Sequence, residues 1–169
     1  MKIVISKHNE GWTGILLNNE KLFYSHYSFR NKDEAVNYLS KIAGEEVTVE
    51  ERNHPYIDVI NGIVDGTSFD LPKINLDFSG FTDKESDVLK ALLKIPAGEV
   101  VSYAELGKRA GIPNAARFVG NVMAKNRFGP IVPCHRVILS DGRMGKFSGK
   151  ENHPMKKKML TQEKAKFRF

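Results

Sequence analysis

Cys134 is the only cysteine of this 169-residue chain, and its neighbours favour a reactive thiol. It is followed directly by His135 and Arg136, and Arg143 lies nearby in the sequence. A thiolate, the form of cysteine that attacks carbon, is favoured by adjacent cations and by a base that removes its proton. The segment therefore predicts a nucleophilic cysteine. The alternative is a buried cysteine that acts only as a small apolar residue.

The segment before Cys134 contains two prolines, Pro130 and Pro133. Each removes a backbone donor and disfavours the helical conformation in the residue before it. We therefore expect an extended, non-helical approach to Cys134. Successive side chains of an extended segment point to opposite faces, so His135 would need a bend or a bridging water to reach the thiol.

The composition limits the other chemistry that the chain could perform. One cysteine cannot form an internal disulfide, and with scattered histidines it cannot supply the four ligands of a structural zinc site. We expect no metal and no cofactor. No apolar run approaches the ~20 residues of a membrane-spanning helix, and 41% hydrophobic with 27% charged residues is typical of a globular protein, which we expect inside the cell.

Helix signals are dense in the C-terminal half, which must position Cys134. Thr82 with Glu85 and Ser102 with Glu105 have the spacing of capping boxes. Asn114, after a Gly-Ile-Pro turn, is a candidate N-cap for a third helix. Two short helices joined by a tight turn are typical of a helix-turn-helix. The predicted helices cover residues 82–93, 102–110 and 114–125.

The charge distribution indicates a polyanion as the partner of the C-terminal half. Residues 81–169 carry 18 Lys and Arg against 8 Asp and Glu, a balance of +10, whereas residues 1–80 have a balance of −4. The third predicted helix begins with Ala115 and Ala116 around Arg117 and ends at Lys125. Small residues and one long cation would let this helix lie close to a DNA backbone. A solvated surface of mixed charge is the alternative.

The N-terminal half predicts a mixture of strands and helices. Alternating or apolar runs indicate three strands, and Asn18-Asn19 has hairpin-turn chemistry. Helical spacing follows Asn31 and again Pro55, and Gly44 and Gly66 end the two runs. The strands are expected at residues 3–5, 14–17, 22–29 and 47–49, and the helices at residues 31–43 and 55–65.

The sequence Pro133-Cys134-His135-Arg136-Val137, with Asn126 before it and Gly-Lys-Phe-Ser-Gly at residues 145–149 after it, resembles the active-site signature of the O6-alkylguanine-DNA alkyltransferases, or methylated-DNA-protein-cysteine methyltransferases. The resemblance covers residues 81–169. It implies an α+β protein in which a ribonuclease-H-like domain, residues 1–77, precedes a winged helix-turn-helix domain, residues 78–169.

The resemblance also implies the reaction. A methyl or alkyl group would pass from O6-alkylguanine in double-stranded DNA to Cys134 in a single, irreversible turnover, with O4-alkylthymine as a further candidate donor. The protein would act as a monomer without a cofactor, in the cytoplasm or, in a eukaryote, in the nucleus. Catalytic roles fall to Cys134, His135 as its base through water, Glu163 that orients the histidine, and Tyr103 that donates to the leaving base.

The remaining site residues follow from the same resemblance. Ser148 would bond the departing O6, and the carbonyl of Val137 would read the exocyclic amine. Arg117 would fill the space left by a flipped nucleotide. The implied pocket residues are Asn126, Val137, Phe147 and Ser148, and the implied DNA-binding residues are Arg117, Ala115, Ala116, Ser102 and Lys125. The chain departs from the family pattern at Arg127 and Gly129, where prolines are common, and at Phe147, where a tyrosine is common.

Three other functions fit parts of the pattern. A non-catalytic winged-helix sensor of alkylation damage would bind alkylated DNA but would lack the cysteine. A winged-helix transcription regulator with a buried cysteine would not need Tyr103, Ser148 and Glu163. A cysteine hydrolase would need water to resolve the adduct, and a thioether offers no activated carbonyl for that attack.

Overall fold

The computed structural model describes residues 1–9 and 11–168, and the chain divides into two compact units. The first contains Met1–Ser79 and Arg127–Ile131, and the second contains Gly80–Asn126 and Val132–Phe169. The sequence places one boundary after residue 77, and nothing in it indicates that residues 127–131 return to the first unit. No helix in the described part of the chain is long and apolar enough to cross a membrane.

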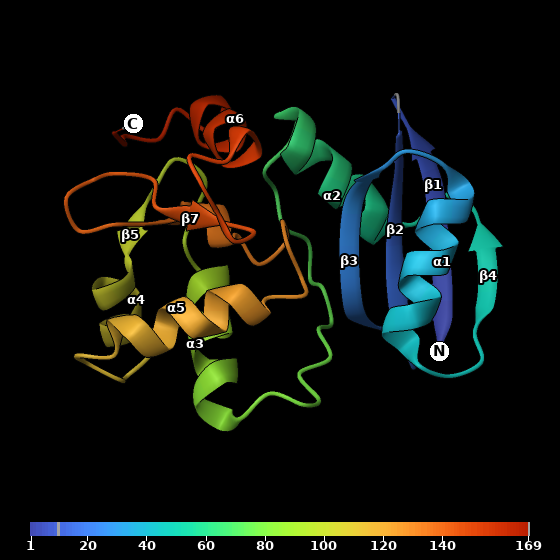
Figure 1. The fold of residues 1–169 in the computed structure, drawn as a ribbon, viewed down its shortest axis with the longest axis horizontal. Helices are drawn as coiled ribbons and strands as arrows, with labels where there is room; N and C mark the ends of the chain where they lie inside the picture. The colour runs from blue at the N-terminus through green and yellow to red at the C-terminus, as the bar shows by residue number, and fades with distance from the viewer. Residues whose placement is uncertain (10, 169) are drawn as a thin grey trace. The chain divides into compact units, whose positions relative to one another are not determined.

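The first unit is built on a four-stranded sheet of order β3-β2-β1-β4 (Figure 1). Neighbouring strands are antiparallel except for β1 and β4, which are parallel. The turn between β2 and β3 lies at Asn19 and Glu20, both with positive φ, one residue later than the predicted pair. The strands are β1 (Lys2–His8), β2 (Gly11–Asn18), β3 (Lys21–Phe29) and β4 (Thr48–Glu51).

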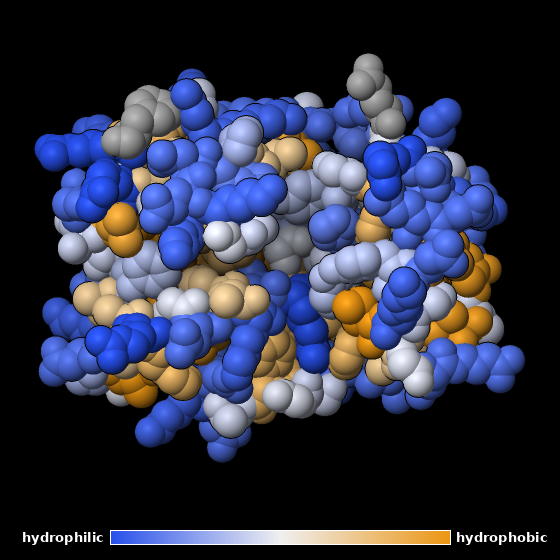
Figure 2. Space-filling view, viewed as in Figure 1, coloured by the Kyte–Doolittle hydropathy of each residue, from blue (hydrophilic) through white to orange (hydrophobic). Residues whose placement is uncertain are grey.

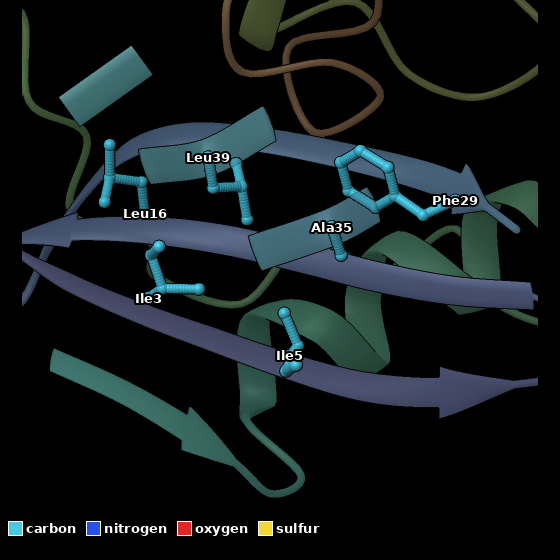
Figure 3. Close-up of a cluster of buried hydrophobic side chains, with 6 residues drawn as sticks. All are labelled: Ile3, Ile5, Leu16, Phe29, Ala35 and Leu39. Atoms are coloured by element: carbon cyan, nitrogen blue, oxygen red, sulfur yellow. The ribbon is translucent and has the colours of Figure 1, made fainter. Parts of the chain in front are cut away.

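Two helices bury the apolar residues of this sheet. Helix α1 (Lys32–Ala43) begins where the Asn31 side chain accepts a hydrogen bond from the Glu34 amide, and it ends at Gly44, whose φ of 65° is left-handed. Helix α2 (Pro55–Asp65) has His54 as its N-cap and buries the apolar residues Ile57, Ile60, Ile63 and Val64. Figure 3 shows the core on the α1 side of the sheet, which consists of Ile3, Ile5, Leu16, Phe29, Ala35 and Leu39.

The second unit contains the three predicted helices. Helix α3 (Asp83–Leu93) begins with the full capping box of Thr82 and Glu85. At the start of α4 (Tyr103–Arg109), Ser102 accepts a hydrogen bond from the Glu105 amide. Helix α5 (Ala116–Lys125) has Ala115, not Asn114, at its N-cap and no side-chain cap. Asn114 was the wrong N-cap because it is part of the preceding turn, with a φ of 62°.

The remaining elements of the second unit are short and were not predicted from the sequence. Two strands, β5 (Val101–Ser102) and β6 (Val137–Ile138), form a parallel pair, and a 3-10 turn at Cys134–Arg136 precedes β6. An antiparallel hairpin follows, with β7 (Lys146–Phe147) and β8 (Lys150–Glu151). Helix α6 (Pro154–Gln162) completes a small core of Ile138, Met144 and Leu160. The protein is thus of mixed α+β class.

Candidate active site

Cys134 begins the 3-10 turn, and its backbone is held by local hydrogen bonds. The Cys134 amide donates to Val132 O at 2.9 Å, and the Arg136 amide donates to Pro133 O at the same distance. The predicted extended approach is wrong, because residues 129–131 form a turn and the bend continues to residue 132. This bend separates the surroundings of the two neighbouring side chains: Cys134 is partly exposed, whereas His135 is completely buried.

His135 and Glu163 form a buried pair. His135 Nε2 lies 2.8 Å from Glu163 Oε1, and neither side chain is exposed. Burial lowers the pKa of His135 despite the nearby carboxylate. Burial alone would raise the pKa of Glu163, but hydrogen bonds from His135 and Arg136 outweigh it and hold this pKa at about 2. At neutral pH, therefore, a neutral imidazole donates from Nε2 to a carboxylate.

The tautomer leaves His135 Nδ1 as a proton acceptor. This nitrogen is buried, and no group of residues 1–9 or 11–168 forms a hydrogen bond with it. A neutral imidazole whose Nε2 carries the proton has its lone pair on Nδ1. The pair can therefore accept a proton at Nδ1 while Glu163 stabilises the resulting imidazolium.

The two arginines that were expected to favour the thiolate have other partners. Arg136 is 2% exposed and donates to Glu163 from Nε at 3.0 Å and from Nη2 at 2.8 Å. Its Nη1 donates to Ile95 O at 2.5 Å. Arg143 is exposed and pairs with Asp141 at 2.8 Å. Arg136 thus fixes the carboxylate that holds His135, and Arg143 stabilises a surface turn.

Lys156 is the cation that acts on the thiol, and the sequence analysis missed it. The residue is completely buried, and its Nζ donates to Val137 O at 2.6 Å. Burial lowers the pKa of Lys156 to about 8, and the charge of Cys134 opposes this. Burial raises the pKa of the Cys134 thiol, whereas the Asn126 side chain and the Lys156 charge act to lower it.

Helical periodicity could have identified Lys156. The run of three lysines at residues 156–158 has the composition of a solvated surface. Residues 159, 160 and 163, however, lie three, four and seven positions after Lys156 and are all buried. These spacings define one face of a helix, so a lysine at position 156 belongs to the buried face.

Cys134 lines a cavity of about 490 Å³ in the second unit. Five of the residues implied by the resemblance line it: Tyr103, Asn126, Cys134, Phe147 and Ser148. The sequence analysis missed Gly120, Met123, Ala124, Lys146 and Gly149, of which the first three lie on α5. His135, Glu163 and Val137 are not part of the lining. These three residues are instead buried, since each is 7% exposed or less.

The structure determines the protonation, hydrogen bonding or backbone conformation of the polar residues that line the cavity. Burial and the nearby Cys134 charge raise the pKa of Tyr103, so its hydroxyl remains protonated and can donate. The Asn126 side chain donates to Val132 O at 2.8 Å, which closes the loop between α5 and the 3-10 turn. Ser148 has a φ of 48° and precedes Gly149 with a φ of 78°, a tight turn between β7 and β8. Phe147 packs edge-on against His153, with ring centroids 5.3 Å apart.

The expected DNA-binding residues lie along α4 and α5. Ala116 and Arg117 are exposed at the first turn of α5, while Lys125 at the end of this helix pairs with Glu85 at 2.5 Å. Gly107 of α4 lets the turn between the helices approach closely, because a Cβ there would lie 3.0 Å from Ile112 O. In the region of α5, Figure 2 shows moderately hydrophobic residues beside strongly hydrophilic ones.

No cluster of three or more His, Cys, Asp and Glu side chains in the described residues is arranged to hold a metal ion. The groups that the site offers for chemistry are an acceptor sulfur in a cavity, a neutral histidine paired with a carboxylate, a buried lysine and a protonated tyrosine.

Comparison with known proteins gives consistent matches. Residues 83–165 match the family described as 6-O-methylguanine DNA methyltransferase, DNA binding domain. A methylated-DNA--protein-cysteine methyltransferase of Mycobacterium bovis is 41% identical over 112 residues, which cover 65% of this chain and 64% of the relative. One of Methanothermobacter thermautotrophicus is 36% identical over 107 residues, which cover 63% of this chain and 58% of the relative. The aligned part of the chain thus spans about 60% of the length of these relatives.

The fold likeness extends over both units. A crystal structure of Mycobacterium tuberculosis OGT in complex with DNA superposes with a TM-score of 0.75 and 28% sequence identity, and the match covers 97% of this chain and 93% of that one. The Pro-Cys-His-Arg-Val sequence lies inside the matched residues 83–165. Together, the sequence match of residues 83–165 and the fold show that the chain is similar to the methylated-DNA-protein-cysteine methyltransferases over both units.

Proposed function

We propose that this protein repairs DNA by transferring a methyl or larger alkyl group from O6 of guanine to its own Cys134, once and irreversibly. The observation that carries the proposal is the placement of Cys134 at a cavity and directly before the buried His135–Glu163 pair. O4-alkylthymine presents an alkyl group on a similar exocyclic oxygen, and we propose it as a second substrate.

The transfer begins with the thiol proton. His135 Nδ1 accepts this proton through a water molecule, and Glu163 stabilises the imidazolium across the 2.8 Å hydrogen bond. The thiolate that remains is stabilised by the charge of Lys156. Its lone pair attacks the alkyl carbon, so the S–C bond forms as the C–O6 bond breaks.

The electron pair of the broken bond passes to the guanine. The Tyr103 hydroxyl, which stays protonated, donates a hydrogen bond to the base, and Ser148 donates one to O6 as its charge develops. The guanine anion then takes up one proton from solvent and the His135 imidazolium releases one, so the products are neutral guanine and a neutral histidine. The product on the protein is a thioether. It has no activated carbonyl for water to attack, so the sulfur is not regenerated and each molecule reacts once.

The surroundings of the cavity support DNA as the substrate. We propose that α4 and α5 form a helix-turn-helix, with the β7–β8 hairpin as its wing, and that the first unit is a ribonuclease-H-like domain. The α5 N-terminus has no side-chain cap, and Ala116 and Arg117 are exposed there. These features suit a helix pressed against DNA, with Arg117 replacing a nucleotide that rotates out of the duplex into the cavity.

Partner and location follow from the substrate. We propose that the protein acts as a monomer on double-stranded DNA, in the cytoplasm or in the nucleus of a eukaryote. Residues 1–77 and 78–169 would form its two domains, except that residues 127–131 belong with the first. Lys125 is expected to contribute less than Arg117, because Glu85 already neutralises its charge.

Mass spectrometry after incubation with a duplex that contains one O6-methylguanine tests the proposal. We expect one added methyl group on the peptide that contains Cys134 and unmodified guanine in the DNA. Binding without a reaction would instead support a damage sensor or regulator. Multiple turnovers with no group retained would support a hydrolase.

A further inference from the structure

Residues 127–131 leave the second unit and belong to the first, although the residues on both sides belong to the second. The loop is closed at its base, where the Asn126 side chain donates to Val132 O at 2.8 Å. Cys134 follows only two residues after this closure. The loop that belongs to the first unit therefore ends within three residues of the acceptor sulfur.

Arg127 makes the polar side-chain contacts of this loop. Its Nη2 donates to Asp77 O and to Ser79 O, both at 2.7 Å. The guanidinium carbon lies 3.9 Å from the centroid of the Phe23 ring on β3. A planar guanidinium can stack on an aromatic ring while it donates in its own plane, a combination that a lysine cannot reproduce.

The backbone of the loop is fixed to the same strand. The Ser25 amide donates to Arg127 O at 2.9 Å, and Ser25 Oγ donates to Gly129 O at 2.9 Å. Phe128 is completely buried and packs edge-on against Phe78, with ring centroids 5.5 Å apart. The loop is thus anchored to the edge strand β3 through Arg127 and Gly129, and to Phe78 through Phe128.

We propose that Arg127 is a positioning residue for Cys134. It replaces the stiffness that a proline would give this position by a set of contacts with β3 and with residues 77–79. The inference concerns the geometry and reactivity of the thiol. It rests on the proposed function only where the alkyl donor is a guanine.

The test compares Arg127→Ala and Arg127→Lys with Arg52→Ala in the full chain. Arg52 is a matched control, because it is also an arginine of the first unit, pairs with Glu50 at 2.7 Å and donates to Asn53 O at 3.1 Å. For each variant, three quantities are measured: the rate constant for reaction with free O6-benzylguanine, the pH profile of Cys134 alkylation by iodoacetamide, and the urea unfolding midpoint.

We expect Arg127→Ala to lower the benzylguanine rate constant roughly 10- to 100-fold, because displacement of a reacting group by about 1 Å can cost that much. The iodoacetamide profile should move to lower pH, since burial is the main cause of the raised thiol pKa. Arg127→Lys should lie between Arg127→Ala and the wild type. Arg52→Ala should change neither rate nor profile.

Unchanged rate and profile in Arg127→Ala would overturn the inference, whatever the unfolding midpoint, because an arginine that only stabilises the first unit would leave the folded protein equally reactive. Equal effects of Arg52→Ala would also overturn it. If Arg127→Ala does not fold, Phe23→Leu removes the stacking alone and must shift the profile in the same direction. If the wild type does not react with O6-benzylguanine, the proposed function is contradicted. The pH profile of alkylation by iodoacetamide would still decide the role of Arg127.

Discussion

Glu163→Gln tests the buried network behind Cys134. Glu163 accepts hydrogen bonds from His135, from Arg136 and from the Gly98 amide. A glutamine has nearly the same shape but no charge, so it leaves the Arg136 guanidinium buried and uncompensated. Breaking a buried ion pair in this way costs about 3–5 kcal/mol.

The pH dependence of this loss is set by the pKa of Glu163. Its folded value of about 2 lies below its ordinary value, so ionised Glu163 contributes stability above the ordinary pKa. A depression of roughly two units corresponds to about 3 kcal/mol. This contribution is fully present at pH 7 and is lost as the pH falls from about 5 toward 2. The difference between the wild type and Glu163→Gln should shrink over the same range.

Urea unfolding at pH 7, 5 and 3 measures the difference in the free energy of unfolding. Glu151→Gln is the control, because Glu151 is an exposed carboxylate on β8 and its substitution should stay within about 0.5 kcal/mol at every pH. A difference below about 1 kcal/mol at pH 7, or one that does not change with pH, would refute the assignment of Glu163 as an ionised, paired carboxylate.

Three further variants test the site. Cys134→Ala should abolish methyl transfer and leave DNA affinity nearly unchanged in a gel-shift titration, because the thiol makes no phosphate contact; retained transfer would contradict the proposed acceptor. Arg117→Ala should slow reaction with a methylated duplex far more than with free O6-benzylguanine, since only the duplex requires unstacking, worth a few kcal/mol; equal losses in the two rate constants would indicate a structural role. Lys156→Met should move the pH profile of Cys134 alkylation by iodoacetamide to higher pH, because the charge that lowers the thiol pKa is removed; an unmoved profile would show that Lys156 does not act on the thiol.

Local signals predicted the long elements well. Helix α3 was located because Thr82 and Glu85 satisfy each other's backbone amides, a relation between residues three positions apart. Helix α1 was located from Asn31, whose side chain accepts from the Glu34 amide, and from Gly44, which ends the helix in a left-handed conformation. Such signals depend only on nearby residues, so they can be recognised without knowledge of the tertiary structure.

The short elements could not be predicted, because they depend on distant partners. β5 and β6 have two residues each, and their hydrogen bonds join Val101 to Val137 and Ser102 to Ile138 across the unit. The anchor of Arg127 likewise needs Phe23, Asp77 and Ser79, which are separated from it by 48 or more positions. A departure from a family motif marks such a position but does not identify its partners.

The roles of charged residues at the site were predicted least well. Arg136 was expected beside the thiol because it is close in sequence, yet it binds Glu163. Lys156 acts on the thiol from 22 positions away. The side chains of Cys134 and Arg136 point in different directions because they lie on a tight turn, whereas the buried face of helix α6, which carries Lys156, packs against that turn. Spatial neighbours of a nucleophile are therefore predicted better from the periodicity of surrounding helices than from the residues beside it.

The parallel pair of β5 and β6 also determines where this chain can change length. Tyr103 directly follows β5, and the turn that carries Cys134 directly precedes β6. The pairing of these two-residue strands therefore fixes where the Tyr103 hydroxyl lies relative to the Cys134 sulfur. One residue inserted after Ser102 would rotate the start of α4 by about 100° and carry the tyrosine hydroxyl out of the cavity. Gly44, in contrast, lies in the turn after α1, where an added Cβ would meet nothing within 4 Å. Insertions and deletions should accumulate at such turns, while the residue counts that join this strand pair to Tyr103 and to Cys134 stay constant.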